Sequence, residues 1–180
     1  VSQNLEIPVD TVYTTSHTTT IKEKAVNYQA MTGFQPVWNT NGEVMASLYF
    51  TYYKRTNDSK NNKRPLIISF NGGPGSASVW MHIAYTGPKI LHIDDEGYPL
   101  QPYGVKSNPN SILDVADIVF VNPVNTGYSR KVLLKDKTYE DDKSFFGINA
   151  DIKYLARWIN TFVTSHNRWE SPKYIIGESY

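Results

Sequence analysis

Two short apolar runs, each ended by a glycine-containing turn, constrain the fold of this chain most. The run Leu66-Ile67-Ile68-Ser69-Phe70 precedes Asn71-Gly72-Gly73-Pro74-Gly75-Ser76, and Lys173-Tyr174-Ile175-Ile176 precedes Gly177-Glu178-Ser179-Tyr180. Short runs rich in β-branched and aromatic residues and bounded by Gly or Pro are typical of buried strands. A Gly-x-Ser turn directly after such a strand is typical of a serine hydroxyl raised above a sheet. Taken singly, each motif also fits an ordinary turn at a strand end.

The first part of the chain predicts antiparallel strands. Residues 18–54 are rich in Thr, Val, Tyr and Phe, and the Asn41-Gly42 pair is a strong hairpin signal. After this turn, apolar side chains alternate with polar ones, which predicts a half-buried strand. The residues on the apolar face are Val44, Ala46, Leu48, Phe50 and Tyr52. Residues 1–17 carry no such pattern, and we expect an irregular leader there.

Residues 65–180 alternate predicted strands with predicted helices. Strands are expected at 66–70, 117–121 and 173–176, a short helix at 77–85 and a long helix at 141–166. The expected apolar stripe of the long helix consists of Ile148, Ile152, Leu155, Ala156, Ile159, Phe162 and Val163. Alternating strands and helices imply parallel strands joined by right-handed crossovers. The sequence therefore predicts an α/β fold in which an antiparallel hairpin precedes parallel strands with flanking helices.

Five sequence blocks, in this order, resemble the serine carboxypeptidase family. The blocks are residues 71–76, Gly87-Pro88, Asn108-Pro109 with Ser111, residues 121–129 (VNPVNTGYS) and residues 177–180 (GESY). The resemblance implies an α/β-hydrolase fold. Residues 1–180 would form the N-terminal portion of a single hydrolase domain, truncated at the nucleophile elbow.

The resemblance also implies the chemistry of the motifs. Ser179 corresponds to the nucleophile, and the N–H groups of Gly73 and Tyr180 correspond to the donors that stabilise the oxyanion. A phosphate-binding loop is the alternative for a glycine-rich turn, but neither Gly-Lys-Ser/Thr nor Gly-x-Gly-x-x-Gly is present. The implied reaction is acyl transfer through Ser179, and it needs no metal or organic cofactor.

Substrate recognition is implied for three further residues. Asn71, Gly72 and Glu178 correspond to family residues that bind the free C-terminal carboxylate of a peptide. Asn71 and the Gly72 N–H can donate to a carboxylate directly, whereas Glu178 can donate only when protonated. Without the resemblance, a turn cap for Asn71 and a surface acid for Glu178 are the simpler interpretations. The expected partners are therefore peptide or protein C-termini.

The histidines of this chain do not fit the base of the catalytic triad. In this fold the triad runs Ser, Asp or Glu, then His, and His17, His82, His92 and His166 all precede Ser179. We expect the triad Asp and His beyond Tyr180, in the remainder of the hydrolase domain, and we expect residues 1–180 alone to be inactive. His166 is expected at the surface, stabilised by the dipole of the long helix.

Three departures from the family pattern leave details of the site open. Tyr85 stands where many secreted members carry a glutamate, and we keep it as a further candidate substrate-binding residue. Asn122 and Asn125 replace more usual residues of their block. The chain has no cysteine, although many members have one in the glycine loop.

Composition limits the possible partners. The net charge is +1 and 19% of the residues are charged, so bulk electrostatics indicates no nucleic-acid partner. No apolar run approaches the roughly 18 residues of a membrane span. The absence of cysteine excludes disulfides within these residues, but a secreted or periplasmic location remains our expectation.

Three functions remain open from the sequence. A serine carboxypeptidase is favoured, and an acyltransferase or esterase with the same machinery is the first alternative. A non-catalytic fragment or interaction subunit is the second.

Overall fold

A computed structural model describes residues 9–57, 63–132 and 144–180. The strands are β1 (Val12–Ile21), β2 (Lys24–Trp38), β3 (Val44–Arg55), β4 (Leu66–Phe70), β5 (Lys89–Leu91), β6 (Val105–Ser107), β7 (Asp117–Val121), β8 (Arg130–Lys131) and β9 (Lys173–Gly177). The helices are the π-helix η1 (Met81–Thr86), the 3-10 helix η2 (Ile112–Asp114) and the α-helix α1 (Ile148–Ser165).

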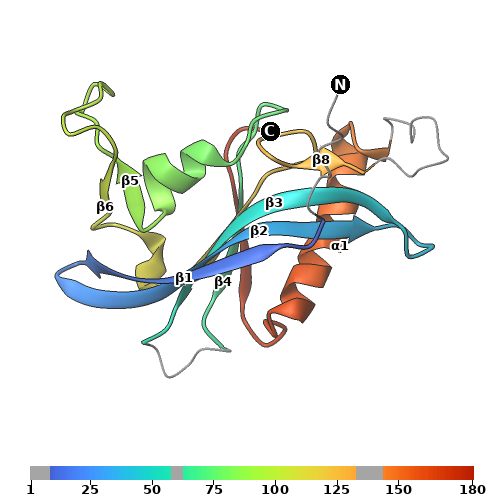
Figure 1. Cartoon of the computed structure of the whole chain (residues 1–180), viewed down its shortest axis with the longest axis horizontal. Helices are drawn as coiled ribbons and strands as arrows, with labels where there is room; N and C mark the ends of the chain where they lie inside the picture. Colours follow the sequence, from blue (N-terminus) through green and yellow to red (C-terminus); the bar gives the residue numbers. More distant parts are fainter. Residues whose placement is uncertain (1–8, 58–62, 133–143) are drawn as a thin grey trace, which may run out of the picture.

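One mixed sheet organises the molecule. Its strand order is β1-β2-β3-β7-β4-β9, and β8 adds a short pairing to β3. The first four of these strands pair antiparallel, whereas β7, β4 and β9 pair parallel. The α/β prediction of an antiparallel hairpin followed by parallel strands is therefore confirmed (Figure 1). Because β7, β4 and β9 run in the same direction, the turns that follow them share one edge of the sheet.

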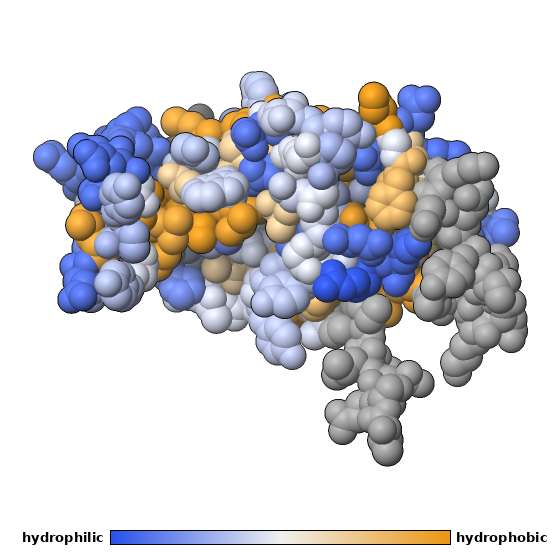
Figure 2. All heavy atoms as spheres, turned by 90° about the horizontal axis from the view of Figure 1, so that it is seen from above, coloured by the Kyte–Doolittle hydropathy of each residue, from blue (hydrophilic) through white to orange (hydrophobic). Residues whose placement is uncertain are grey.

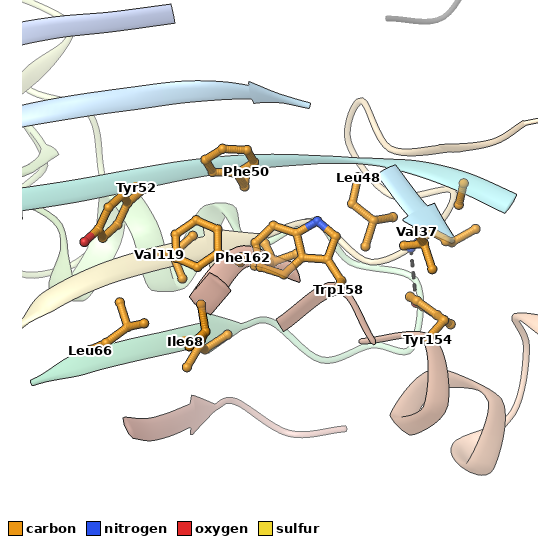
Figure 3. Packing of buried hydrophobic residues seen from close by; sticks show 14 of the residues in the cluster. Val37, Leu48, Phe50, Tyr52, Leu66, Ile68, Val119, Tyr154, Trp158 and Phe162 are labelled. Atoms are coloured by element: carbon orange, nitrogen blue, oxygen red, sulfur yellow. Dashed lines mark hydrogen bonds between the residues drawn. The ribbon is translucent and has the colours of Figure 1, made fainter. Parts of the chain in front are cut away.

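Helix α1 covers one face of the sheet and forms the larger core there. Trp158 and Phe162 are fully buried and stack at a centroid distance of 5.1 Å, and both lie edge-on to Phe50 of β3. Figure 3 shows these rings between α1 and the strands. The Tyr154 hydroxyl of the same helix accepts a hydrogen bond from the Val124 N–H (3.2 Å), which joins α1 to the loop after β7.

The opposite face carries a smaller core beneath η1 and η2. Its buried apolar members are Ile67, Met81, Ala116, Ile118 and Phe120. Beyond this core the β5–β6 hairpin projects from the sheet (Figure 1). Seen from above, the end of the molecule that carries the hairpin is largely hydrophilic, and apolar side chains gather inward of it (Figure 2). The segment that follows the glycine loop lies on this face, because it leads into η1, which begins ten residues after Asn71.

A buried ion network closes the edge of the sheet where β4 and β7 begin. Asp117 accepts hydrogen bonds from Arg64 Nε (3.0 Å), Arg168 Nη1 (2.6 Å) and the Arg55 N–H (3.0 Å). Arg168 also donates to the Tyr52 hydroxyl and to the carbonyl of Arg64. Asp117 and Arg168 are both 0% exposed, so each charge depends on the other groups for the hydrogen bonds that water would otherwise supply. The network joins β7 to the turn between α1 and β9.

Two expectations about the elements are wrong in part. The irregular leader ends before Val12, because residues 12–17 belong to β1 and pair with β2 from Val12↔Gly33 to Ile21↔Lys24. Side chains 12–18 are all exposed, so the strand has no apolar alternation that a sequence pattern could reveal. Residues 1–8 lie outside the described residues. The expected short helix at 77–85 is η1, which begins later, at Met81.

The long helix also differs from the expectation. It begins at Ile148, directly after Gly147, whose φ of 112° is incompatible with a helix. The expected start at Asp141 lies outside the described residues. Tyr154 and Trp158 carry the buried face together with Phe162 and Val163. Ile148, Ile152 and Ala156, expected in the stripe, are instead exposed.

Candidate active site

The site forms where β4 and β9 end side by side. These strands pair in parallel, with Phe70 opposite Gly177, so the chain leaves both strands at the same level. The Glu178 N–H donates to the Phe70 carbonyl (3.3 Å), which extends the pairing by one step. The register therefore brings Asn71 next to Glu178, although the two residues are 107 positions apart in the sequence.

Asn71 is buried and its amide is oriented by two partners. Its Oδ1 accepts from the Met81 N–H (3.1 Å), and its Nδ2 donates to Glu178 Oε2 (3.0 Å). A flipped amide would set its NH₂ group against the Met81 N–H, so the hydrogen bonds define the orientation. Two of the residues predicted to recognise a carboxylate thus touch each other directly.

Ser179 adopts the backbone conformation expected of a nucleophile elbow. Its φ is 65°, in the left-handed region, which costs about 1–2 kcal/mol for a residue with a Cβ atom. The surroundings leave room for this turn because position 72 has no side chain. A Cβ atom on Gly72 would lie 2.4 Å from the Glu178 carbonyl oxygen, 2.5 Å from the Tyr180 nitrogen and 2.9 Å from Ser179 Cβ. The glycine loop and the serine turn are therefore in backbone contact.

The two predicted oxyanion donors, the N–H groups of Gly73 and Tyr180, lie at this backbone contact. Gly73 follows Gly72 with a φ of 128°, a conformation that glycine adopts readily. The Tyr180 nitrogen lies against Gly72, and the Tyr180 hydroxyl reaches Asp151 Oδ2 of α1 (3.3 Å). The catalytic assignment of both N–H groups stays a prediction.

A mainly apolar groove of about 420 Å³ adjoins the turn. It lies between β9 and α1, and its walls include Phe70, Pro123, Ile152, Leu155, Ile175 and Tyr180. Asn71 and Gly177 contribute to the same wall, so the groove opens next to the predicted reaction centre.

Tyr85 stays apart from the hydrogen-bonded cluster. It lies in the last turn of η1 with 62% of its side chain exposed, and its carbonyl accepts from Asn108 Nδ2 (2.9 Å). Within the described residues, no hydrogen bond joins its phenol to Asn71 or Glu178. Its role in substrate binding stays a prediction.

Neither of the two half-buried histidines, His82 and His166, is placed to activate Ser179. His82 Nε2 bonds the Tyr53 hydroxyl (2.7 Å), and its ring stacks on Phe120 at 4.5 Å. Burial lowers the pKa of His82 to about 4, so its ring is neutral near pH 7. The chain order had excluded His82 as the base, and this geometry agrees.

His166 contradicts the expectation of a surface cation. The residue is half-buried, and its ring packs on Phe162 (4.3 Å) and Tyr52 (5.2 Å). Burial is the largest cause that lowers its pKa to about 4, and the charges of Lys54 and Arg168 add to it. The side chain turns toward the sheet, so the helix dipole stabilises no charge there.

No sequence pattern indicates Ser78, which the structure places in the wall behind Asn71. Ser78 is buried, and its Oγ accepts from the Asn71 N–H (3.2 Å) and donates to the Val121 carbonyl (2.5 Å). A single serine between Ala77 and Val79 matches no motif. Among the residues that the structure describes, no three His, Asp or Glu side chains come together as metal ligands.

The family model for serine carboxypeptidases matches residues 20–180. The chain belongs to the serine carboxypeptidase family. This match covers the sheet from β2 onward together with the glycine loop and the serine turn.

Relatives from several organisms show the same similarity. Serine carboxypeptidase-like 29 of Arabidopsis thaliana is 31% identical over 143 residues, which cover 78% of this chain and 27% of the relative. Carboxypeptidase Y of Schizosaccharomyces pombe is 32% identical over 135 residues, covering 74% of this chain and 12% of the relative. The chain thus spans less than a third of the length of these serine carboxypeptidases.

A solved carboxypeptidase has the same fold over most of the chain. The crystal structure of Kex1Δp, a prohormone-processing carboxypeptidase from Saccharomyces cerevisiae, superposes with a TM-score of 0.61 at 25% identity. The superposition covers 84% of this chain and 31% of the yeast chain. The described part of the chain contains no helix long and apolar enough to cross a membrane.

Proposed function

We propose that the complete protein is a serine-type carboxypeptidase that releases C-terminal residues from peptides through an acyl-enzyme. The observation that carries this proposal is the contact of the Asn71–Glu178 pair with the strained Ser179 turn across Gly72. A carboxylate-recognition group beside a nucleophile suits a substrate whose reacting carbonyl lies one residue from its free end. Membership of the serine carboxypeptidase family supports the proposal that the chain is part of a hydrolase.

In the proposed reaction, Ser179 Oγ attacks the last peptide carbonyl while a histidine takes its proton. The N–H groups of Gly73 and Tyr180 stabilise the negative charge that forms on the carbonyl oxygen. The histidine then returns the proton to the leaving amine, and water hydrolyses the acyl-enzyme. Residues beyond Tyr180 supply this histidine and its orienting aspartate, so we propose that residues 1–180 alone are inactive.

The released residue is recognised by its carboxylate. One Asn71 Nδ2–H bonds Glu178, which leaves the second for the substrate, next to the Gly72 N–H. Glu178 lies at the same place and repels a carboxylate unless it carries a proton. A peptide with a C-terminal amide carries no negative charge there and escapes this repulsion.

The nucleophile is tested by labelling the complete enzyme with a fluorophosphonate and mapping the adduct. We expect modification at Ser179 and loss of both labelling and hydrolysis in Ser179→Ala. Labelling of another serine in an active preparation would refute the assignment. Exposed Ser165 provides a matched control, because Ser165→Ala removes a hydroxyl at the far end of α1.

Carboxylate recognition is tested with one peptide in two forms, as the free acid and as the C-terminal amide. Glu178→Gln should raise kcat/KM for the free acid relative to the amide, since a glutamine amide donates without an added proton. A ratio of free-acid to amide hydrolysis that Glu178→Gln leaves unchanged would contradict the role of Glu178. Product analysis with an alcohol acceptor separates hydrolysis from acyl transfer. We also propose a secreted or periplasmic location, which fractionation of the source cells tests.

A further inference from the structure

Behind the candidate site, the buried side chain of Ser78 links the start of the glycine loop to the end of β7. Ser78 Oγ lies between two backbone groups, the Asn71 N–H (3.2 Å) and the Val121 carbonyl (2.5 Å). A carbonyl oxygen can only accept, so the hydroxyl proton points to Val121 and a lone pair faces Asn71. The Ser78 N–H in turn donates to Asn122 Oδ1 (3.0 Å). The serine therefore joins the ends of β4 and β7 and the turn that follows β7.

We infer that Ser78 is a positioning residue that aims the Asn71 amide at the substrate carboxylate, an inference that rests on the proposed function. Asn71 begins the glycine loop, and three hydrogen bonds hold it: Ser78 Oγ at its N–H, the Met81 N–H at its Oδ1 and Glu178 at its Nδ2. The first bond anchors the backbone from which the amide projects.

The hydrogen bond to Ser78 affects the position of the Asn71 amide because a second anchor, the Met81 N–H, lies on the same segment as Ser78. Met81 is three residues beyond Ser78, so both hold Asn71 against the start of η1. Without the hydroxyl, the Asn71 N–H and the Val121 carbonyl, both in buried residues, lose a partner. The start of the loop then has to shift to recover hydrogen bonds, and the Asn71 amide moves with it. Glu178 and Ser179 belong to the other strand end and remain in place.

The inference predicts an effect on recognition that exceeds the effect on chemistry. In Ser78→Ala of the complete enzyme, kcat/KM for a free-acid peptide should fall about ten-fold relative to the same peptide as C-terminal amide, mainly through KM. A misplaced hydrogen bond to a charged group accounts for a factor of this size. Ser78→Thr keeps the hydroxyl, and the cavity of about 240 Å³ beside Ser78 leaves room for its methyl group. This variant should restore the ratio to within about three-fold of wild type.

Ser111 provides a matched control. Its buried Oγ also accepts from a backbone N–H (Leu113, 3.3 Å) and donates to a carbonyl (Thr86, 3.1 Å), but it caps η2 instead of holding Asn71. Ser111→Ala should lower thermal stability as Ser78→Ala does, yet leave the ratio of free-acid to amide hydrolysis unchanged. An equal loss of this ratio in both variants would show a general effect of destabilisation and overturn the inference.

Two further variants keep the outcomes distinct. Should Ser78→Ala fail to fold, Ser78→Cys decides the matter, since its weakly bonding thiol should lower the ratio in the same direction. If Asn71→Ala lowers the ratio but Ser78→Ala or Ser78→Cys keeps it at the wild-type value, the inference about Ser78 alone is refuted. If Asn71→Ala also keeps the ratio at the wild-type value, the proposed recognition of the substrate carboxylate by Asn71 is refuted as well. Retained hydrolysis in Ser179→Ala would instead refute the proposed function itself.

Discussion

Replacing Asp117 by Asn is expected to destabilise the protein strongly, although the two side chains have nearly the same shape. Asp117 Oδ1 accepts from Arg64 and from the Arg55 N–H, and its Oδ2 accepts from Arg168. An asparagine sets its NH₂ group against one of these donors in either orientation. The substitution also removes the negative charge that neutralises Arg168, which is 0% exposed.

The magnitude follows from burial. Removing one partner of a buried ion pair costs about 3–5 kcal/mol, because the remaining charge is left in the interior. Three residues earlier, Asp114 pairs with Lys22 at 2.8 Å, with side-chain exposures of 27% and 65%. An exposed pair of this kind contributes at most about 1 kcal/mol. Asp114→Asn is thus the matched control, and the two variants should differ by about 3 kcal/mol, or roughly a hundred-fold in the unfolding constant.

The assay is urea unfolding of the complete protein, followed by tryptophan fluorescence. Trp158 is fully buried in the core against α1, so its emission reports loss of this packing. The midpoint should shift far more for Asp117→Asn than for Asp114→Asn, at unchanged slope. Equal midpoints for the two variants would refute the reasoning, since Asp117 differs from Asp114 in its burial and in its three hydrogen bonds.

Three further predictions concern the site, His82 and the core. Gly72→Ala should lower kcat of the complete enzyme at least about 100-fold and should also lower Tm, because its Cβ would lie 2.4 Å from the Glu178 carbonyl oxygen, a backbone atom; activity near wild type would contradict the contact. The pKa of His82 is about 4 in the folded protein and about 6.5 when unfolded, so the free energy of unfolding should fall by on the order of 3 kcal/mol as pH falls from 6.5 to 4, with no contribution from His82 above that range. His82→Asn should flatten this dependence of the unfolding free energy on pH. Trp158→Ala should destabilise by about 3–5 kcal/mol in urea unfolding, and a loss below 1 kcal/mol would contradict its place in the core.

The elements that the sequence predicts well have local causes. β3 shows apolar alternation because one of its faces packs on α1, and β4 and β7 read as apolar runs because helices cover both of their faces. The serine turn and the glycine loop carry residue types that their backbone conformations demand. These features are encoded within a few neighbouring residues, so a pattern can reveal them.

The parts that escape prediction depend on distant partners. β1 is held by backbone pairing to β2 and buries few side chains, so its sequence carries no periodic signal. The burial of His166 depends on the packing of α1 against Tyr52, which no local pattern contains. The same holds for Ser78 and Asn71, because their orientation arises where two strand ends and η1 converge.

The distance in sequence between Asn71 and Glu178 has a consequence during synthesis of the chain. The strands β1, β2 and β3 pair with their immediate neighbours, so they can assemble as soon as they leave the ribosome. Glu178 is made 107 residues after Asn71, a delay of roughly 5–20 s at ordinary elongation rates. Pairing over such separations is also slow, because a long loop must close first. The glycine loop of a nascent chain is therefore made well before its serine turn, and the contacts of Asn71 and Gly72 with that turn form only when β9 joins β4.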